Sequence, residues 1–514
     1  MRKDNISIVS SNNKIAKNTL MLYFRHIVIM LVTLYTVRIV LTTLGVEDYG
    51  IYTVVGGVVA MFSFFNSTMA SASQRFFSYA LGLGDAERLR RTFATNWIVY
   101  SLIAVLALLL LETVGLWFIH YHLVLPSGRI EVALWVYHFS VLSFLCSIMT
   151  TPFMAMIIAH EDMNIYAYVA ILEAILKVVV VLLLINISSD KLQLYGILTF
   201  LSTFFVSSVY FIVCKRKYSE CKFRLILDKA IFREISSYTG WSIFGSISVV
   251  IRNQAVTILL NQMFNPIVVA ARAISVQVSN NVNVFSNNFN TGLYPPIIKS
   301  YATNDKERML SLIFNGSKMT YFFMYVFTLP LLLKMPYILD FWLKEPPDGA
   351  VIFTQLALVD ALITSVSLPL MTAVRATGKI KMYELSLGSI LIASFFISWL
   401  VLHLGAEAYV VMVIAIVATS LMFVFRLFLL RKILKFPVLK YMTKVIVPLI
   451  VISFISFFFS FIISSFMPDK FIYICVFIFL SLIITSVNMF FIGLNKYERK
   501  VFLGVIINKI RTRK

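Results

Sequence analysis

The sequence predicts an all-α integral membrane protein of about fourteen transmembrane helices, arranged as two like lobes of six helices and a C-terminal helix pair. The 514 residues are 60% hydrophobic and only 13% charged, with a mean hydropathy of +0.88. A soluble domain of this size could not bury so much apolar surface. Long apolar runs recur along the chain, and two segments are repeated in its second half, which indicates a polytopic membrane protein built by duplication.

The apolar runs have the length of a bilayer-spanning helix, about 20 residues. We expect spans at 18–44, 50–74, 95–118, 131–158, 163–186, 193–213, 240–263, 268–296, 310–333, 350–374, 383–403, 408–430, 441–465 and 471–494. The first run is too long for a signal peptide and has no small-residue cleavage site. It is therefore expected to be retained.

An internal repeat divides the chain into halves. The turn and basic loop at 41–91 have a diluted copy about 220 residues later, and 151–168 aligns without gaps with 368–385. The aligned pairs include Asn66 with Asn287, Pro152 with Pro369, Ala159 with Ala376, and Tyr166 with Tyr383. The two prolines are candidate flex points, because proline removes a helical hydrogen bond. Six spans in each repeat give both lobes the same orientation, related by a pseudo-two-fold axis along the membrane normal.

These boundaries predict four parts: an N-terminal lobe at 1–213, a basic cytoplasmic linker at 214–239, a C-terminal lobe at 240–430, and a terminal hairpin with a basic tail at 431–514. Most of the Lys and Arg in the loops fall in one set of alternate loops, which includes both termini. By the positive-inside rule, both termini are expected in the cytoplasm.

The net charge of +21 raises the question of nucleic acid binding. The basic clusters are short, are split among many loops, and are attached to no folded extramembrane domain. We therefore expect the charge to orient the chain and to contact anionic membrane lipids, with no nucleic acid as partner.

Five cationic side chains interrupt the apolar spans. They are Arg25, Arg38, Lys177, Arg252 and Arg272. An ionisable group in hydrocarbon costs several kcal/mol unless it is paired or hydrated, so each should face a partner or a watery cavity. Snorkelling to the interface is the alternative for Arg38 and Arg272.

Two acids also lie well inside spans. Glu173 stands four residues before Lys177, a spacing that allows the two side chains to neutralise each other. Asp360 has no obvious local partner, which makes it the first acidic candidate for coupling transport to H+ or Na+. Glu173 and Lys177 are further candidates for that role. Enzyme and metal-site signatures such as HExxH, GxSxG and the P-loop are absent from the sequence, so no catalytic residue, metal or cofactor is expected.

The eighth span carries a ladder of amides. Its members are Asn280, Asn283, Asn287 and Asn290. Spacings of three, four and three residues place them on one helical face, and Asn66 marks the corresponding face of the second span. Lipid cannot satisfy amide groups, and so many of them favour a cavity lining over helix packing alone. Arg binds phosphate bidentately and Asn both donates to and accepts from sugars, so this combination suits a phosphorylated glycan.

The unit LG-x-E-D-Y-G-I-Y-x-V-V-G-G, followed by NSTMASASQRFFS and GLGD, resembles the Wzx-type polysaccharide and O-antigen flippases of the multidrug/oligosaccharidyl-lipid/polysaccharide (MOP) exporter superfamily. The residues that carry the resemblance are Leu44, Gly45, Glu47, Asp48, Tyr49, Gly50, Tyr52, Gln74, Arg75, Gly84 and Asp85. The resemblance implies a MATE-like fold with a cationic cavity between the lobes. It also implies movement of an undecaprenyl-pyrophosphate-linked oligosaccharide across the bacterial inner membrane by alternating access. It transfers no binding residue.

We therefore expect a flippase for an O-antigen or other surface-polysaccharide repeat unit. Arg25 and Arg252 are expected to hold the pyrophosphate, the amides the sugars, and polysaccharide assembly proteins are left open as further partners. The first alternative is a drug/cation antiporter of the same superfamily, which would need an acidic, aromatic-lined cavity. The second is a membrane glycan polymerase or ligase, which would need a large outer loop with catalytic side chains. The short outer loops argue against it.

Overall fold

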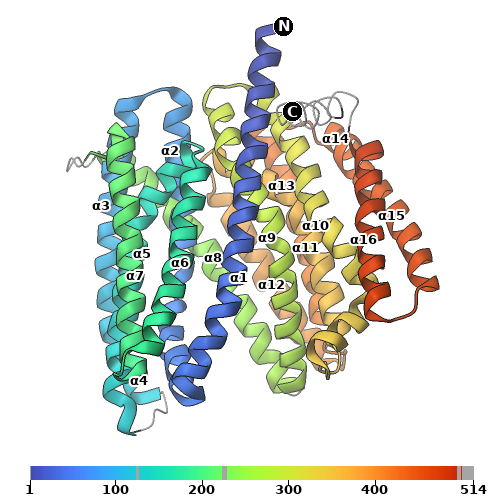
Figure 1. Ribbon diagram of the computed structural model, residues 1–514. Coiled ribbons are helices and arrows are strands. Elements are labelled where there is room, and N and C mark those ends of the chain that lie inside the picture. The colour runs from blue at the N-terminus through green and yellow to red at the C-terminus, as the bar shows by residue number, and fades with distance from the viewer. Residues whose placement is uncertain (1, 123–126, 223–227, 265, 495–498, 500–514) are drawn as a thin grey trace, which may run out of the picture. The chain divides into compact units, whose positions relative to one another are not determined.

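The computed structural model describes residues 2–122, 127–222, 228–264, 266–494 and 499. Every regular element in these ranges is helical (Figure 1). Twelve of the described helices are long and apolar enough to cross a membrane. The chain is therefore a multi-pass, all-α membrane protein, as the sequence predicts. The basic tail expected after residue 494 lies outside the described residues except for Arg499.

The helices of the first repeat are α1 (Arg2–Ala60), α2 (Ser63–Leu83), α3 (Ala86–Leu110), α4 (Leu116–His122), α5 (Ile130–Ala159), α6 (Met163–Asn186) and α7 (Lys191–Lys217). Those of the second repeat are α8 (Lys229–Met263), α9 (Pro266–Ala302), α10 (Lys306–Leu343), α11 (Ala350–Ala376), α12 (Lys381–His403) and α13 (Val410–Leu434). The short α14 (Val438–Tyr441), α15 (Val447–Phe466) and α16 (Phe471–Asn488) follow.

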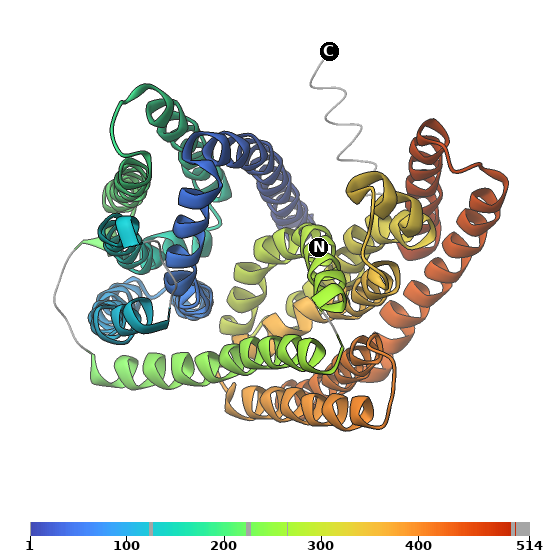
Figure 2. The same ribbon diagram turned by 90° about the horizontal axis from the view of Figure 1, so that it is seen from below.

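The chain divides into two compact units, which we call the N-terminal unit (Asn18–Ser246) and the C-terminal unit (Ile247–Lys514 with Met1–Lys17). The boundary between them falls inside α8. Within the N-terminal unit, α5 packs against α2, α3, α6 and α7, and within the C-terminal unit α11 packs against α9, α10 and α13. The hairpin of α15 and α16 packs beside α10, as Figure 1 and Figure 2 both show.

Two of the fourteen expected spans are helical but are not among the twelve apolar helices. Residues 50–74 cover the end of α1 and the start of α2, across a turn at Met61–Phe62, and 268–296 lie within α9. These are the two segments that the repeat aligns, and they carry Asn66 and the amide ladder. The turn at Met61–Phe62 divides the first of these segments between two helices, and α2 and α9 are too polar to count as apolar spans.

The breaks in the helices fall at positions other than the matched prolines. At Gly45 the backbone adopts φ 78° and ψ 169°, a conformation that glycine tolerates because it has no Cβ, and α1 turns at this point (Figure 1). This is the turn predicted after the first span. Lys334 interrupts α10 with φ −118° and ψ 24°. Pro152 and Pro369 lie inside α5 and α11, which continue as helices through them.

The repeat is visible in matched helix caps. Asp85 caps α3 by accepting a hydrogen bond from the Arg88 N–H at 2.9 Å, and Asp305 caps α10 by accepting from the Arg308 N–H at 3.0 Å. A carboxylate at the N-cap satisfies a free N–H and complements the helix dipole. Both halves therefore begin their third span with the same local device.

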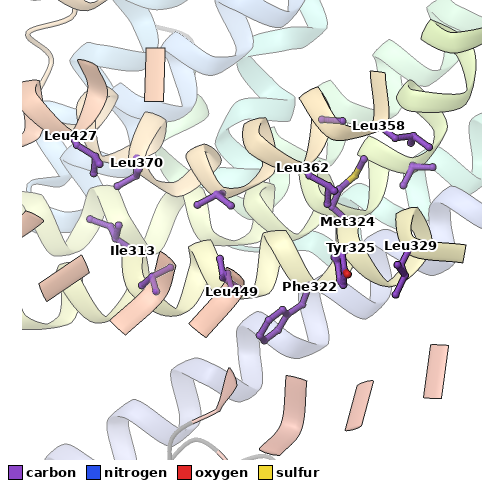
Figure 3. Packing of buried hydrophobic residues seen from close by; sticks show 14 of the residues in the cluster. Ile313, Phe322, Met324, Tyr325, Leu329, Leu358, Leu362, Leu370, Leu427 and Leu449 are labelled. Atoms are coloured by element: carbon purple, nitrogen blue, oxygen red, sulfur yellow. The ribbon is translucent and has the colours of Figure 1, made fainter. Parts of the chain in front are cut away.

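The two units differ in how their apolar interiors are built. The C-terminal unit has one large buried cluster, drawn in Figure 3, that runs from Leu427 and Leu370 past Leu362 to Leu329. The N-terminal unit has two separate large clusters, one containing Ile148 and the other Phe153. Since Ile148 and Phe153 are both on α5, the separation between the clusters falls within one helix.

Candidate functional site

A cavity of about 560 Å³, with many polar side chains on its wall, lies in the N-terminal unit. Five helices form its walls: α1, α2, α5, α6 and α7. The part of α1 before Gly45 and the part after it both contribute. It occupies the level at which α5 passes from one apolar cluster to the other. Four of the residues predicted from the sequence line it, namely Arg25, Asn66, Glu173 and Lys177.

The charges that line this cavity are two cations and one carboxylate. Lys177 and Glu173 form an ion pair at 2.9 Å, with each side chain about half exposed. The predicted i, i+4 pair is therefore formed. Because the pair is internally neutral, Arg25 gives the cavity a net positive charge.

Arg25 sits above the ring of Tyr166, with its guanidinium carbon 4.4 Å from the ring centroid. This cation–π contact orients the side chain without neutralising it. The Nε atom of Arg25 and the Oδ1 atom of Asn66 are buried and have no hydrogen-bond partner among the described residues. Buried polar atoms are nearly always satisfied. Two unsatisfied atoms on the wall of one cavity therefore indicate a place for water or a polar ligand.

Hydroxyl groups from α5 and α7 form a belt along the cavity wall. Its members are Ser147, Thr150, Thr151, Thr199, Ser202, Thr203 and Ser207. Ser147, Thr151 and Thr203 each donate to the carbonyl four residues earlier, at 2.9 to 3.1 Å. A hydroxyl that donates within its own helix still has lone pairs available. The belt therefore offers mainly acceptors, which suit the hydroxyl donors of a sugar.

A second group of charges lies in the C-terminal unit. Arg272 is 9% exposed and donates to the Thr257 hydroxyl on α8. It is therefore buried and hydrogen-bonded within the protein. Arg252 on α8 and Asp360 on α11 are both half-buried and close enough for their charges to interact. Asp360 also interacts with the Thr419 hydroxyl, so it has partners that the sequence did not reveal.

The amide ladder of α9 is not sealed by packing. Asn280 and Asn287 are exposed, and Asn283 and Asn290 are half-buried. The Oδ1 atom of Asn290 is buried without a partner among the described residues. A neighbouring face of α9 makes contacts with other helices, since Ser286 donates to the Thr320 carbonyl at 2.6 Å. The amides are thus not needed to hold α9 in place.

Arg38 does not belong to the cavity of the N-terminal unit. Its side chain is exposed on α1, and it is not among the residues that line the cavity. The structure therefore gathers four predicted residues in one cavity and brings Arg252, Arg272 and Asp360 together in the other unit. Arg38 lies outside the cavity.

Sequence reasoning missed an ion-pair group next to the Gly45 turn. Arg129 pairs with Asp48 at 2.5 Å and also with Asp190, which caps α7. Burial raises the pKa of Asp48, against the opposing effect of Arg129. Burial also acts on Asp190, but hydrogen bonds from the Gln193 N–H and from Arg129 outweigh it and lower its pKa. Asp48 belongs to the motif quoted above, and that was the available signal.

Arg75, another motif residue, directly follows the expected second span and is 4% exposed within α2. It pairs with Glu234 of α8 at 3.1 Å and lies over the ring of Phe76, 4.6 Å from the centroid. Its role is therefore to bind the first part of α8 to the N-terminal unit. Its position between polar and aromatic residues in the sequence did not reveal this.

Comparison with solved structures identifies the architecture. A crystal structure of a MATE protein superimposes with a TM-score of 0.72 at 13% identity, over 83% of this chain and 97% of that one. The chain has the MATE fold. An outward-facing multidrug resistance MATE family transporter of the MOP superfamily gives a TM-score of 0.69 at 13% identity, covering 81% and 94% of the two chains. A mutant of the Vibrio cholerae MATE transporter VcmN gives 0.64 at 15% identity, covering 82% and 98%.

The MATE fold accounts for the two lobes of six helices that the repeat predicts. No protein-family model matches the sequence, and no curated protein matches it significantly. At identities this low, the comparison establishes the fold, and the function has to be argued from the chain's own residues.

Proposed function

We propose that this protein is a flippase that moves an undecaprenyl-pyrophosphate-linked oligosaccharide across the bacterial inner membrane by alternating access. The observation that supports this most directly is the cavity of the N-terminal unit, which is roomy, rich in hydroxyls and net positive. An anionic pyrophosphate is attracted by such a cavity, and sugar hydroxyls can donate to its wall. The MATE fold, with two lobes of six helices, supports transport as the general activity.

In this proposal, cationic side chains bind the phosphates of the ligand, and amide and hydroxyl side chains bind its sugars. Arg25 contacts a phosphate oxygen, because its guanidinium is oriented by Tyr166 and has no carboxylate partner among the described residues. The hydroxyl belt and Asn66 contact the sugars, and the α9 amides offer the same chemistry within the C-terminal unit. Arg252 and Arg272 supply further positive charge for the phosphates, and Arg38 meets the ligand or the headgroup region from the exposed face of α1. Both termini lie in the cytoplasm, where the lipid-linked glycan is loaded.

A drug/cation antiporter is the second candidate, because one of the similar structures is a multidrug resistance transporter. A cationic drug needs an uncompensated carboxylate in its cavity. Here the only carboxylate that lines the described cavity, Glu173, is paired with Lys177 at 2.9 Å. The net positive charge would repel an organic cation, so the cavity favours an anionic substrate.

Ion coupling is assigned to Asp360, with the Glu173–Lys177 pair as a second place where a proton could bind. Asp360 is half-buried, its Oδ1 atom has no hydrogen-bond partner among the described residues, and Arg252 is its nearest described source of positive charge. In a proteoliposome assay, Asp360→Asn should leave downhill flipping intact while removing its response to an imposed H+ or Na+ gradient. An unchanged gradient response in this variant would refute the assignment.

The central test compares Arg25→Ala with Arg216→Ala, a variant at an exposed cation in the last turn of α7. Both remove one positive charge, but only Arg25 lines the cavity. A charge-assisted hydrogen bond contributes about 2 kcal/mol, so flipping of a labelled lipid-linked oligosaccharide in proteoliposomes should fall about thirtyfold for Arg25→Ala alone.

The same two variants should differ in cells. In a strain that lacks the gene, the wild-type chain and Arg216→Ala should restore the surface polysaccharide, and Arg25→Ala should not. Drug susceptibility should be unchanged in all strains. Restoration of the glycan by Arg25→Ala would remove the cavity from the proposal, and a change in drug export without a change in glycan would favour the antiporter.

A further inference from the structure

A second pocket, of about 180 Å³, lies at one end of the C-terminal unit. It is formed by the end of α9, the start of α10 and the segment that follows α13. A short turn joins α9 to α10, and four crossings separate the end of α9 from the end of α13. All three helix ends are therefore on the same side of the membrane, and it is the side rich in Lys and Arg.

The floor of this pocket is apolar and rigid. Met309, Ile313 and Phe436 line it and are 5%, 0% and 3% exposed. Phe436 is held by the rings of Phe314 and Tyr441, with centroids at 5.7 and 5.5 Å. A floor that is packed in this way keeps its shape when nothing occupies it, so it can receive an apolar chain.

The rim of the pocket is cationic. Lys306 lines it and is exposed. Lys435, which lies between the lining residues Leu434 and Phe436, is exposed with φ 50°, and Arg431 and Lys432 precede it in the last turn of α13. Of the nearby acids, Asp305 already accepts the hydrogen bond that caps α10. The rim therefore offers positive charge at the level where lipid headgroups lie.

We infer that this pocket binds an anionic phospholipid of the cytoplasmic leaflet, with its phosphate at Lys306 and Lys435 and part of one acyl chain on the apolar floor. A free soluble anion would make no use of the floor, and a zwitterionic lipid would make little use of the rim. The pocket lies within one unit, and the inference does not depend on which substrate the protein transports.

The first test measures lipid binding to the full-length protein after delipidation in a neutral detergent. Native mass spectrometry and thermal unfolding would be followed while phosphatidylglycerol or phosphatidylcholine with the same acyl chains is added. Phosphatidylglycerol should bind about tenfold more tightly and raise the unfolding temperature more. Lys306→Gln/Lys435→Gln should lose about thirtyfold in affinity for phosphatidylglycerol, since each of the two basic residues near an anionic surface contributes about one kcal/mol.

The matched control is Lys215→Gln/Arg216→Gln, which removes two exposed cations from the end of α7. It should bind phosphatidylglycerol as the wild-type protein does. Equal losses in the two double variants would mean that the lipid responds only to overall surface charge, and the pocket would not be a site.

A third variant tests the apolar floor. Leu310 is half-buried at the edge of the pocket, so Leu310→Trp should narrow it and weaken phosphatidylglycerol binding at least fivefold, with all lysines present. Unchanged binding in Leu310→Trp would overturn the acyl-chain contact. Glycerol phosphate, the headgroup without chains, should fail to compete at millimolar concentration, and full competition would identify a soluble-anion site instead.

Discussion

The interiors of the two units differ in where polar side chains interrupt the apolar packing. In the N-terminal unit, α5 carries Thr150 and Thr151 between the residues of two apolar clusters, and a cavity of about 560 Å³ opens at that level. In the C-terminal unit, the apolar cluster is continuous through α10, α11 and α13. The two six-helix repeats thus share their helices and capping turns but differ in their interiors.

The matched tyrosines make the contrast specific. Tyr166 in the first repeat and Tyr383 in the second each lie beside an arginine. Arg25 lies over Tyr166 and lines the cavity. Arg426 is 4% exposed, donates to the Tyr383 hydroxyl at 3.0 Å, and has the buried Glu384 close enough for their charges to interact.

The surroundings of Arg25 and Arg426 indicate different roles for the two side chains. A buried cation that is bonded and accompanied by a carboxylate serves the fold, because removing it leaves the opposite charge buried and unpaired. A cation that lines a cavity without a carboxylate partner contributes little to the fold and is available to a ligand. We therefore propose a ligand-binding role for Arg25 and a structural role for Arg426.

The largest expected effect separates these two roles. Arg426→Ala should lower the free energy of unfolding by about 2 kcal/mol, because it removes a buried hydrogen bond and one of the two cations, Arg375 and Arg426, whose charges act on Glu384. Arg25→Ala should change it by less than about 0.5 kcal/mol. Thermal unfolding of the purified proteins in detergent gives the comparison. Equal destabilisation by the two substitutions would show that Arg25 is also a structural residue.

The fold could be predicted because its signals are carried along the sequence. Spans follow from runs of apolar residues, and the repeat follows from pairs such as Tyr166 with Tyr383. The Gly45 turn followed from the break between the first two spans. The ion pair between Asp48 and Arg129 could not be predicted, because its partners are 81 residues apart and a charged residue in a loop is normally read as solvated.

The site could be predicted only as a set of residues. Arg25, Asn66, Glu173 and Lys177 were identified because they are polar within apolar spans. Their meeting in one cavity depends on which helices pack together, and hydropathy does not contain that information. The hydroxyl belt was overlooked because Ser and Thr can satisfy themselves within a helix. Their repeated spacing of four residues, as in Thr199, Thr203 and Ser207, was the available signal.

A smaller effect tests whether the C-terminal interior is as tightly packed as its continuous cluster indicates. A Cβ added to Gly316 on α10 would lie 2.7 Å from Leu293 and 3.1 Å from the rigid ring of Pro369. Gly316→Ala should therefore cost about 1–2 kcal/mol through overpacking. Gly56 in the N-terminal unit has no atom within 4 Å of such a Cβ.

The matched substitution Gly56→Ala should be neutral or stabilising by up to about 1 kcal/mol, because alanine favours the helix. Thermal unfolding of the two variants beside the wild-type protein measures the difference. If Gly316→Ala were as stable as the wild type, α9 and α11 would have room to yield, and the contrast between the two interiors would be weaker than their apolar clusters suggest.

The smallest effect concerns the ion pairs of Arg129, which lie outside the spans of the N-terminal unit and are partly exposed to solvent. Arg129 and Asp190 have side chains 33% and 30% exposed, so their pair should contribute less than about 1 kcal/mol. Asp190→Asn keeps the helix cap, since asparagine caps as well as aspartate. The substitution therefore isolates the charge.

The pH dependence gives this last prediction its sign. The pKa of Asp190 is lowered in the folded protein, so its contribution is present above the pKa of the unfolded chain, about 3.9, and is lost as the pH falls through the folded value. Asp190→Asn should thus be less stable than the wild type near neutral pH, and the two should converge in acid.

Asp48, whose pKa is raised, acts in the opposite direction, because its folded form gains stability as it takes up a proton. Unfolding curves of Asp48→Asn and Asp190→Asn should therefore depart from the wild type with opposite pH slopes. Slopes of the same sign would mean that Arg129 does not distinguish its two carboxylates.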